Sequence, residues 1–226
     1  HLVFTTQPLT LTAGVTSTVI TIQRRDRFNN PNSSDPSRRM TLTENSGGTT
    51  RFIHATNNTL LPGNLLTITV GSSTASFRYY DTARGLYSIT VTSALPTPIT
   101  GASQNYRVLG AAPVRLKLVG PASQTAGTPV QYTITAFDQF SNQSDPYTGA
   151  HGLTFGGAAA APNGTLPTVT NSNATPINFG SVTTITFASG VATSGGVVTL
   201  YNATGSGVTV TANDAAAGIS ATGVNA

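Results

Sequence analysis

Residues 12–30 read Thr-Ala-Gly-Val-Thr-Ser-Thr-Val-Ile-Thr-Ile-Gln-Arg-Arg-Asp-Arg-Phe-Asn-Asn. Residues 125–142 follow the same plan: Thr-Ala-Gly-Thr-Pro-Val-Gln-Tyr-Thr-Ile-Thr-Ala-Phe-Asp-Gln-Phe-Ser-Asn. In both stretches a Thr-Ala-Gly turn leads into alternating residues that end at Asp-x-Phe-x-Asn. The two copies lie about 112 residues apart. A repeat of this length indicates two tandem copies of one domain.

The repeat sets the expected domain boundary. The chain has 226 residues, and two domains of about 110 residues lie within the usual size range of domains. The short segment Gly110-Ala111-Ala112-Pro113 separates the copies and contains typical linker residues. We therefore expect one domain at residues 1–110 and a second at 111–226, joined by a linker too short for much freedom.

Both copies have the pattern of β-strands. Short runs alternate between apolar and polar residues and are separated by Gly, Pro, Asn and Asp, whereas the helical spacing of apolar residues is missing. About seven short strands per copy predict an antiparallel β-sandwich. The expected strands are residues 2–6, 16–23, 39–44, 65–70, 74–80, 85–92 and 104–108, then 114–119, 130–136, 152–155, 182–188, 197–201 and 208–212. Residues 29–38 and 156–175 are expected to be irregular, the second as a long surface loop or a weak hairpin.

The apolar positions of these strands predict the core of each copy. In the first copy we expect Val19, Ile22, Leu42, Phe77, Ile89 and Val91 to be buried. In the second copy we expect the same of Leu116, Leu118, Ile134, Ile185, Phe187 and Leu200.

The repeated segments also resemble a known family. A Thr-Ala-Gly turn, an alternating strand and Asp-x-Phe-x-Asn are similar to bacterial immunoglobulin-like domains, which occur in tandem in large exported surface proteins and adhesins. Residues 77–90, Phe-Arg-Tyr-Tyr-Asp-Thr-Ala-Arg-Gly-Leu-Tyr-Ser-Ile-Thr, resemble the penultimate strands of that family. Asn29 and Ser141 stand where the family usually has Gly. The resemblance implies an all-β fold of two tandem immunoglobulin-like β-sandwiches.

Positive charge is concentrated in the first copy, where nine Arg residues face four acidic residues. Five of these cations lie near the first Asp-x-Phe-x-Asn motif: Arg24, Arg25, Arg27, Arg38 and Arg39. Because Arg binds phosphate, sulfate and carboxylate groups through two parallel hydrogen bonds, the cluster suggests binding of an anionic glycan or cell-surface polymer. The alternative is a solvated basic edge that discourages pairing between strands of different molecules.

The repeated motif itself has two interpretations. Asp26 and Asn30, like Asp138 and Asn142, offer the oxygen ligands that Ca²⁺ prefers. Asp35 and Asp145, each followed by Pro, add a second carboxylate near each motif. The alternative is a turn in which the Asp and Asn side chains bind nearby backbone amides. Ca²⁺ is the one cofactor that the sequence suggests.

An aromatic platform for sugars is a further hypothesis. Arg78, Tyr79, Tyr80 and Tyr87 lie close together in the sequence and are candidates for it. Core packing and exposed cross-strand pairing explain the same tyrosines. The absence of Trp argues against a platform.

Few residues could support catalysis. The chain has no Cys and three scattered His residues, His1, His54 and His151. It has no nucleophile elbow, no phosphate-binding glycine loop and no paired carboxylates. We therefore expect a protein without enzymatic activity. It also lacks nucleic-acid-binding motifs and an apolar run long enough to enter a membrane, so neither partner is expected.

Three functions are consistent with these observations. The family resemblance favours a non-catalytic spacer or stalk segment of a larger bacterial cell-surface or secreted protein, whose partners are further domains of the same polypeptide. The Arg cluster favours an adhesin-type module that binds a cell-surface polysaccharide or protein. The third is an accessory domain of a secreted polysaccharide-degrading enzyme. All three imply an extracellular or cell-surface location.

Overall fold

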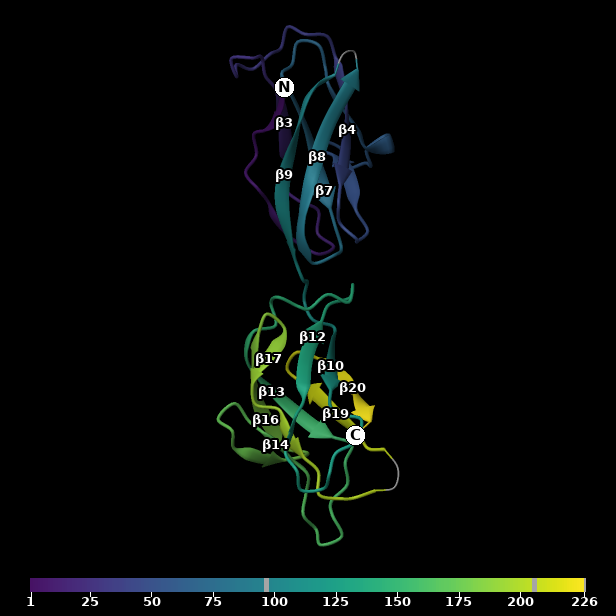
Figure 1. The fold of residues 1–226 in the computed structure, drawn as a ribbon, viewed down its shortest axis with the longest axis vertical. Helices are drawn as coiled ribbons and strands as arrows, with labels where there is room; N and C mark the ends of the chain where they lie inside the picture. The colour runs from purple at the N-terminus through teal and green to yellow at the C-terminus, as the bar shows by residue number, and fades with distance from the viewer. Residues whose placement is uncertain (96–97, 205–206, 226) are drawn as a thin grey trace. The chain divides into compact units, whose positions relative to one another are not determined.

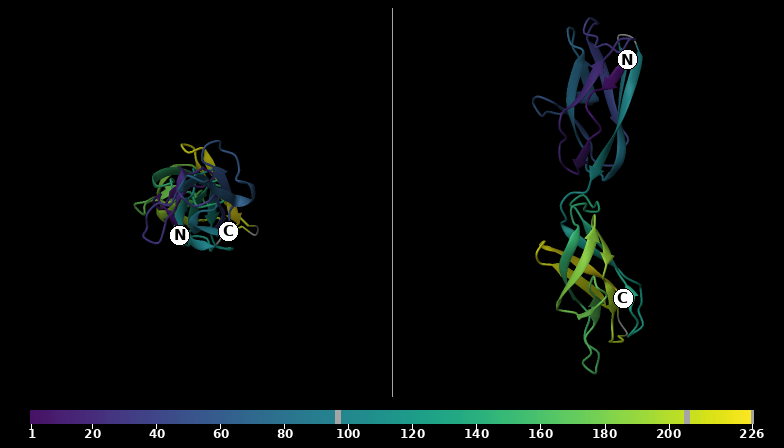
Figure 2. Two further views of the ribbon diagram at one scale, coloured as in Figure 1. Left: turned by 90° about the horizontal axis from the view of Figure 1, so that it is seen from above. Right: turned by 90° about the vertical axis from the view of Figure 1, so that its left-hand side faces the viewer.

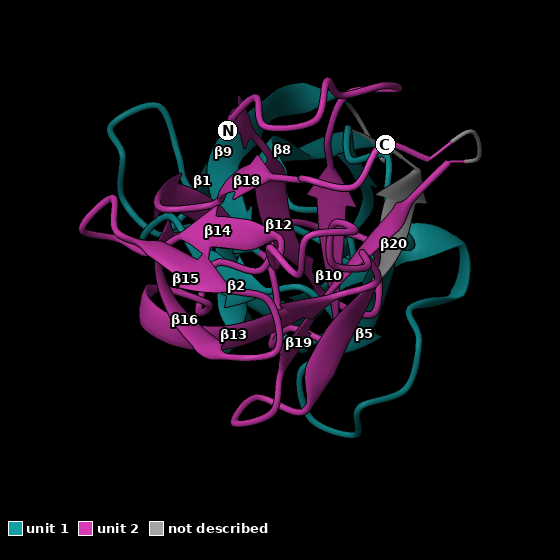
Figure 3. Ribbon diagram, turned by 90° about the horizontal axis from the view of Figure 1, so that it is seen from below, with its two compact units in different colours: residues 1–109 teal, residues 110–226 magenta. Residues whose placement is uncertain are grey.

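The computed structural model describes residues 1–95, 98–204 and 207–225. The chain divides into two compact units, residues 1–109 and 110–226, which are coloured separately in Figure 3. Both consist of β-strands, so the predicted all-β class is confirmed. Within the described ranges the helical segments are limited to one 3-10 turn, η1 (Pro62–Asn64). No helix in the described residues is both long and apolar enough to cross a membrane.

Unit 1 contains two sheets. The first has four strands in the order β1 (Leu2–Phe4), β3 (Ile20–Arg24), β7 (Thr74–Tyr80) and β5 (Arg51–His54). The second has five strands in the order β2 (Thr10–Thr12), β9 (Ile99–Leu109), β8 (Gly85–Leu95), β4 (Arg38–Glu44) and β6 (Leu65–Ile68). The long strands β8 and β9 pair with each other and run side by side through the unit in Figure 1.

One pair of strands in unit 1 departs from the expected antiparallel pattern. β2 pairs with β9 in parallel, with Thr10 opposite Arg107 and Thr12 opposite Leu109. The backbone amide of Ala13 extends this pairing by donating to the carbonyl of Leu109 at 2.8 Å. Along the chain, β2 is the first strand of this sheet and β9 is the last. The two strands are therefore hydrogen-bonded to each other although about 90 residues separate them.

The core of unit 1 lies between its sheets and follows strand alternation. Ile22, Leu42, Phe77, Ile89 and Val91 are buried as predicted. Val19 is not, since 37% of it is exposed. The reason is the period of two residues along a strand: Ile20, Ile22 and Arg24 point inward, so the odd-numbered neighbours point outward. Phe52, Tyr79 and Tyr106 complete an aromatic cluster in this core.

Unit 2 contains a larger and a smaller sheet. The seven strands of the larger sheet follow the order β10 (Arg115–Val119), β12 (Thr133–Phe137), β17 (Val191–Ser194), β16 (Val182–Ala188), β13 (Gly149–Gly156), β19 (Thr209–Asp214) and β20 (Ile219–Asn225). The smaller sheet has the order β11 (Val130–Gln131), β18 (Val197–Thr199), β14 (Thr168–Thr170) and β15 (Pro176–Asn178). Figure 2 shows both units from two further directions.

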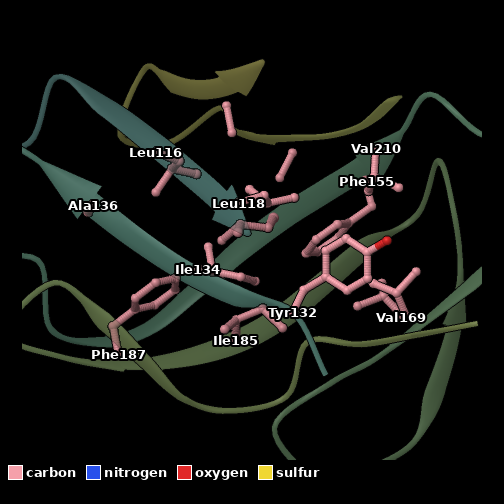
Figure 4. Packing of buried hydrophobic residues seen from close by; sticks show 14 of the residues in the cluster. Leu116, Leu118, Tyr132, Ile134, Ala136, Phe155, Val169, Ile185, Phe187 and Val210 are labelled. Atoms are coloured by element: carbon pink, nitrogen blue, oxygen red, sulfur yellow. The ribbon is translucent and has the colours of Figure 1, made fainter. Parts of the chain in front are cut away.

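The core of unit 2 agrees with the sequence prediction. Leu116, Leu118, Ile134, Ile185, Phe187 and Leu200 are all buried. Figure 4 shows Leu118 of β10 and Ile134 of β12 in one buried cluster with Phe155, Val169 and Val210. The segment 156–175 is only partly irregular, because β14 lies in it and pairs with β15, which directly follows the segment. β14 and β15 have three residues each, and neither lies in a longer run of alternating residues that would have revealed it in the sequence.

Candidate functional site

The first Asp-x-Phe-x-Asn motif forms a closed turn at the end of β3. Oδ1 of Asp26 accepts hydrogen bonds from the backbone amides of Phe28 at 2.8 Å and Asn30 at 2.9 Å. The Asn30 side chain donates to Oδ2 of Asp26 at 3.2 Å. The backbone amide of Asp26 donates to the carbonyl of Asn30 at 2.9 Å and closes the turn. The hydrogen bond from the Asn30 amide is the main cause that lowers the pKa of Asp26.

The second motif repeats this geometry. Oδ1 of Asp138 accepts from the amides of Phe140 at 2.9 Å and Asn142 at 2.8 Å, and the Asn142 side chain donates to Oδ2 at 2.9 Å. The fourth motif residue has a positive φ in both copies, 71° for Asn29 and 67° for Ser141. The turn therefore requires a left-handed residue at this position, and Asn and Ser both adopt that conformation in place of Gly.

The carboxylates of both motifs face N–H donors. Asp26 and Asp138 accept bonds from the side chains of Asn30 and Asn142 as well as from backbone amides, which is the pattern of a turn stabilised by Asp. In the residues that the structure describes, no three His, Asp or Glu side chains gather in a way that could hold a metal. Calcium binding by these residues stays a prediction, and such binding would have to displace these donors.

The acidic loop of unit 2 also binds the start of its own unit. Ala111 donates its backbone amide to Oδ2 of Asp138 at 2.9 Å, and Gly110 donates to Oδ2 of Asp145 at 2.6 Å. The hydroxyl of Ser144 donates to the carbonyl of Ala111 at 2.7 Å. Asp138 is 1% exposed and Ser144 is fully buried. We call Asp138, Ser144 and Asp145 the linker anchor, because they hold the residues that directly follow unit 1.

Two members of the predicted Arg cluster lie in the interior. Arg24 is 1% exposed, and its guanidinium donates to the carbonyls of Asn32, Asp35, Pro36 and Ser72. Arg38 is buried and donates to the hydroxyl of Ser93 at 3.2 Å. Since strand alternation turns Arg24 and Arg38 inward, neither can contact a polymer at the surface. Arg24 instead holds the irregular segment 32–36 against the end of the sheet.

The other three members of the cluster are accessible. Arg27 and Arg39 are exposed, and Arg25 is half-buried. Arg25 donates to the side chains of Gln23 at 2.7 Å and Asn29 at 3.0 Å. Arg27 lies over the ring of Phe28, which is 69% exposed. Anion binding by these three residues stays a prediction.

The structure separates the residues of the predicted sugar platform. Tyr79 is buried, and Tyr87 lies on β8 in the other sheet, with its hydroxyl donating to the carbonyl of Arg84 at 3.1 Å. Arg78 and Tyr80 remain together on one face of β7, because residues two apart on a strand point the same way.

A buried hydrogen-bond network in unit 1 was not predicted from the sequence. The hydroxyls of Tyr79 and Tyr106 lie 2.8 Å apart, and Tyr106 donates to Oδ2 of the buried Asp81 at 3.1 Å. The hydroxyl of Ser46 donates to the other carboxylate oxygen of Asp81 at 3.0 Å. Burial is the main cause that raises the pKa of both Tyr79 and Tyr106.

Unit 2 contains a comparable network. Tyr147 donates to Oδ2 of the buried Asp214 at 2.7 Å, and Nδ1 of His151 lies 2.9 Å from the same oxygen. The His151 ring stacks on Tyr147 with centroids 3.7 Å apart. Burial alone would raise the pKa of Asp214, but hydrogen bonds from Tyr147, Ala217 and His151 lower it overall. Asp81 and Asp214 both lie where a strand ends, yet their partners come from distant parts of the chain.

Comparisons with known proteins give similar solved structures but no family. No protein-family model and no curated protein matches the chain. Domains 4–9 of the surface layer protein SbsC align with all of this chain at 15% identity and a TM-score of 0.34. The chain spans 30% of the length of that structure. InvD of Yersinia pseudotuberculosis aligns with the whole chain at 13% identity and a TM-score of 0.42, with 66% of InvD covered.

A carbohydrate-active enzyme is also among the similar structures. β-Glucuronidase 3 of Bacteroides uniformis aligns with the whole chain at 14% identity and a TM-score of 0.33, and 24% of the enzyme is covered. At these identities and TM-scores, none of the similar structures assigns a function to this chain.

Proposed function

We propose that both units are immunoglobulin-like sandwiches and that the chain is a non-catalytic spacer or stalk segment of a larger bacterial cell-surface or secreted protein. The strand order of unit 1 supports the first part. Its four-stranded sheet joins the first, second, fifth and fourth main strands of such a sandwich, and its larger sheet joins the remaining strands. The repeated turn supports the same assignment for unit 2.

The parallel pairing of β2 with β9 carries the spacer proposal. When the two ends of unit 1 are pulled apart, β2 and β9 are drawn past each other along their length. The hydrogen bonds of the pair then resist together, instead of opening one after another. A segment that separates two parts of a larger protein must withstand tension of this kind.

The chain after β9 is also held by hydrogen bonds. The carbonyl of Leu109 accepts from Ala13, and the linker anchor binds Gly110 and Ala111 immediately afterwards. Tension that leaves unit 1 therefore passes directly into bonded residues of unit 2. Our proposal places the protein outside the cell, gives it further domains of the same polypeptide as partners, and excludes nucleic acid and membrane insertion.

The proposal is tested by stretching single molecules of the whole chain from its two ends. We expect two unfolding events, each releasing roughly 3.3–3.6 Å per residue. Ala13→Pro removes the amide that bonds to Leu109, so it should lower the force at which unit 1 unfolds. The matched control is Leu61→Pro, which removes an amide that donates to Phe52 at 2.9 Å, away from β2 and β9. Leu61 has a φ of −76°, which Pro tolerates.

The force must be compared with equilibrium stability, because both Pro variants lose one hydrogen bond and Leu61→Pro also loses the side chain of a buried leucine. The spacer proposal requires Ala13→Pro to reduce the unfolding force more than its loss of stability in denaturant would explain, and Leu61→Pro not to do so. Equal reductions of force per unit of lost stability in the two variants would contradict it.

A further inference from the structure

The outer face of the four-stranded sheet in unit 1 has a basic and aromatic surface. On β5 and β7, Arg51 lies opposite Tyr80 and Ile53 lies opposite Arg78. Arg78 and Tyr80 are two residues apart on one strand, so all four side chains share one face of the sheet. We call Arg51, Ile53, Arg78 and Tyr80 the outer-face block.

Arg78 is fixed in place by backbone groups on both sides. Its Nη1 donates to the carbonyl of Ser17 at 3.1 Å, and its Nε donates to the carbonyl of Ala55 at 3.5 Å. These bonds use two of the five N–H groups of the guanidinium. A guanidinium that is already oriented loses less side-chain entropy when it binds an anion.

A groove of about 430 Å³ is lined by Thr16, Ile53, Asn58 and Arg78. None of these four residues is acidic, and unit 1 has nine Arg residues against four acidic ones. Asp81, the acidic residue nearest to this strand in sequence, is buried within the unit. Glu44 is half-buried, and its carboxylate accepts a hydrogen bond from Thr50, the neighbour of Arg51, at 2.9 Å. An anionic group in the groove would therefore meet an oriented cation, polar side chains and an aliphatic wall.

Tyr80 and Arg51 extend the surface beyond the groove. The Arg51 guanidinium lies 5.1 Å from the centre of the Tyr80 ring, which is half-buried. Arg51 lies directly across from Tyr80, and Arg78 is two residues before Tyr80 on the same strand, so both cations are neighbours of the tyrosine on this face. Two cations beside an aromatic ring are complementary to a chain of sugar rings that carries several negative charges. The tyrosine ring can pack against the apolar face of a sugar. Each guanidinium can pair with a carboxylate or sulfate group.

We propose that the outer-face block and its groove bind an acidic polysaccharide, with Arg78 and Arg51 pairing with its carboxylate or sulfate groups and Tyr80 contacting a sugar ring. The site is distinct from the Arg cluster around the first turn. It adds a binding activity to the spacer role and does not depend on that role.

The experiment measures binding of the whole chain to defined polymers by calorimetry at moderate salt. The probes are dextran sulfate, polygalacturonate, neutral dextran and polyglutamate. We expect the two acidic polysaccharides to bind more tightly than polyglutamate, which has the charge but no sugar ring, and neutral dextran not to bind. Chemical shifts in residues 51–54 and 78–80 should change when the acidic polysaccharides are added.

Variants separate this site from general attraction of a basic surface. Arg78→Gln and Arg51→Gln should each weaken binding about tenfold, as the loss of a charge-assisted hydrogen bond predicts. Arg107→Gln is the matched control, because Arg107 is exposed on β9 in the other sheet and its loss changes the net charge equally. It should weaken binding much less.

Arg51→Gln tests the site with a residue whose replacement should leave the fold intact. Arg78 bonds to two backbone carbonyls and could affect the fold when replaced, whereas Arg51 is exposed and contacts Tyr80 from outside. Absence of binding by the wild-type chain would overturn the proposal. Equal losses in Arg51→Gln and Arg107→Gln, or polyglutamate binding as tight as that of dextran sulfate, would overturn it as well.

Discussion

Single residues decide the shape of the repeated turn. Asp26 and Asp138 each collect three N–H donors from their own motif, and Asn29 and Ser141 take the left-handed conformation that closes it. The sequence shows the repeat and offers both interpretations of it, a metal site or a turn. The sequence does not show that each carboxylate accepts from two backbone amides and an Asn side chain, because these bonds depend on the direction in which the carboxylate points.

The strained position in unit 2 gives a stability prediction. A non-glycine residue in the left-handed region costs roughly 1–2 kcal/mol, and Asn tolerates it better than Ser. Ser141→Gly should therefore raise the free energy of unfolding of unit 2 by about 0.5–1 kcal/mol, after the entropy of Gly in the unfolded chain is subtracted. Asn29→Gly should change unit 1 much less. Denaturant unfolding of both variants checks this, and equal effects would contradict it.

Arg24 shows where reasoning from sequence fails at this scale. Five Arg residues that are close in sequence suggest one basic surface. The structure instead divides them by the alternation of their strands, and it buries Arg24 with carbonyl partners from a loop and a distant turn. The inward position of Arg24 in its strand is a signal in the sequence that the side chain is buried. The carbonyl groups that accept its hydrogen bonds cannot be identified from the sequence.

At the scale of elements, alternation predicts most of the strands. It misses β2, β5, β14, β15, β17 and the seven-residue β20. β4, β7 and β16 lie within a residue of their expected bounds. β2, β5, β14 and β15 have three or four residues each, and their position depends on pairing with a distant strand. The parallel direction of β2 is likewise a property of the fold, which local sequence does not encode.

The loop that contains the linker anchor gives a second prediction. Asp138→Ala removes the acceptor of three N–H groups in its own turn and that of Ala111. Because buried donors are left unsatisfied, we expect unit 2 to lose about 2–3 kcal/mol of unfolding free energy. The Ala111 amide should also exchange with solvent about tenfold faster or more.

Asp26→Ala is the matched control for that change, since it removes the same turn in unit 1 at a half-buried position. We expect it to cost less stability than Asp138→Ala. Hydrogen exchange and denaturant unfolding measure both effects. An unchanged exchange rate at Ala111 would show that Asp138 does not hold the linker.

At the scale of the whole molecule, stability should depend on pH below about 4. Hydrogen bonds lower the pKa of the buried Asp214 below its ordinary value of 3.8. A carboxyl whose pKa is lower in the folded state stabilises the fold above its unfolded pKa, and this stabilisation is lost as the pH falls through the folded pKa. Unit 2 should therefore become less stable as the pH drops below 3.8.

Asp214→Asn provides the comparison for this prediction, because Asn does not ionise. Unfolding of the wild-type chain and the variant would be measured at several pH values between neutrality and strong acid. The stability of unit 2 should fall less steeply with acid in the variant. Equal slopes would mean that other groups control the acid response.

The linker anchor also defines the residue at which unit 2 should begin when it is moved into another protein. Its first hydrogen bonds are made by Gly110 and Ala111, which lie before the first strand of the unit. The partners are backbone groups, so the residue type matters mainly at position 110, where a Cβ would lie 1.9 Å from the carbonyl oxygen of Gln143. A recombination joint placed after Pro113 would put a side chain into that clash unless the new chain also had Gly there, whereas a joint before Gly110 keeps the glycine. Grafts of this unit into another tandem array should therefore start at Gly110.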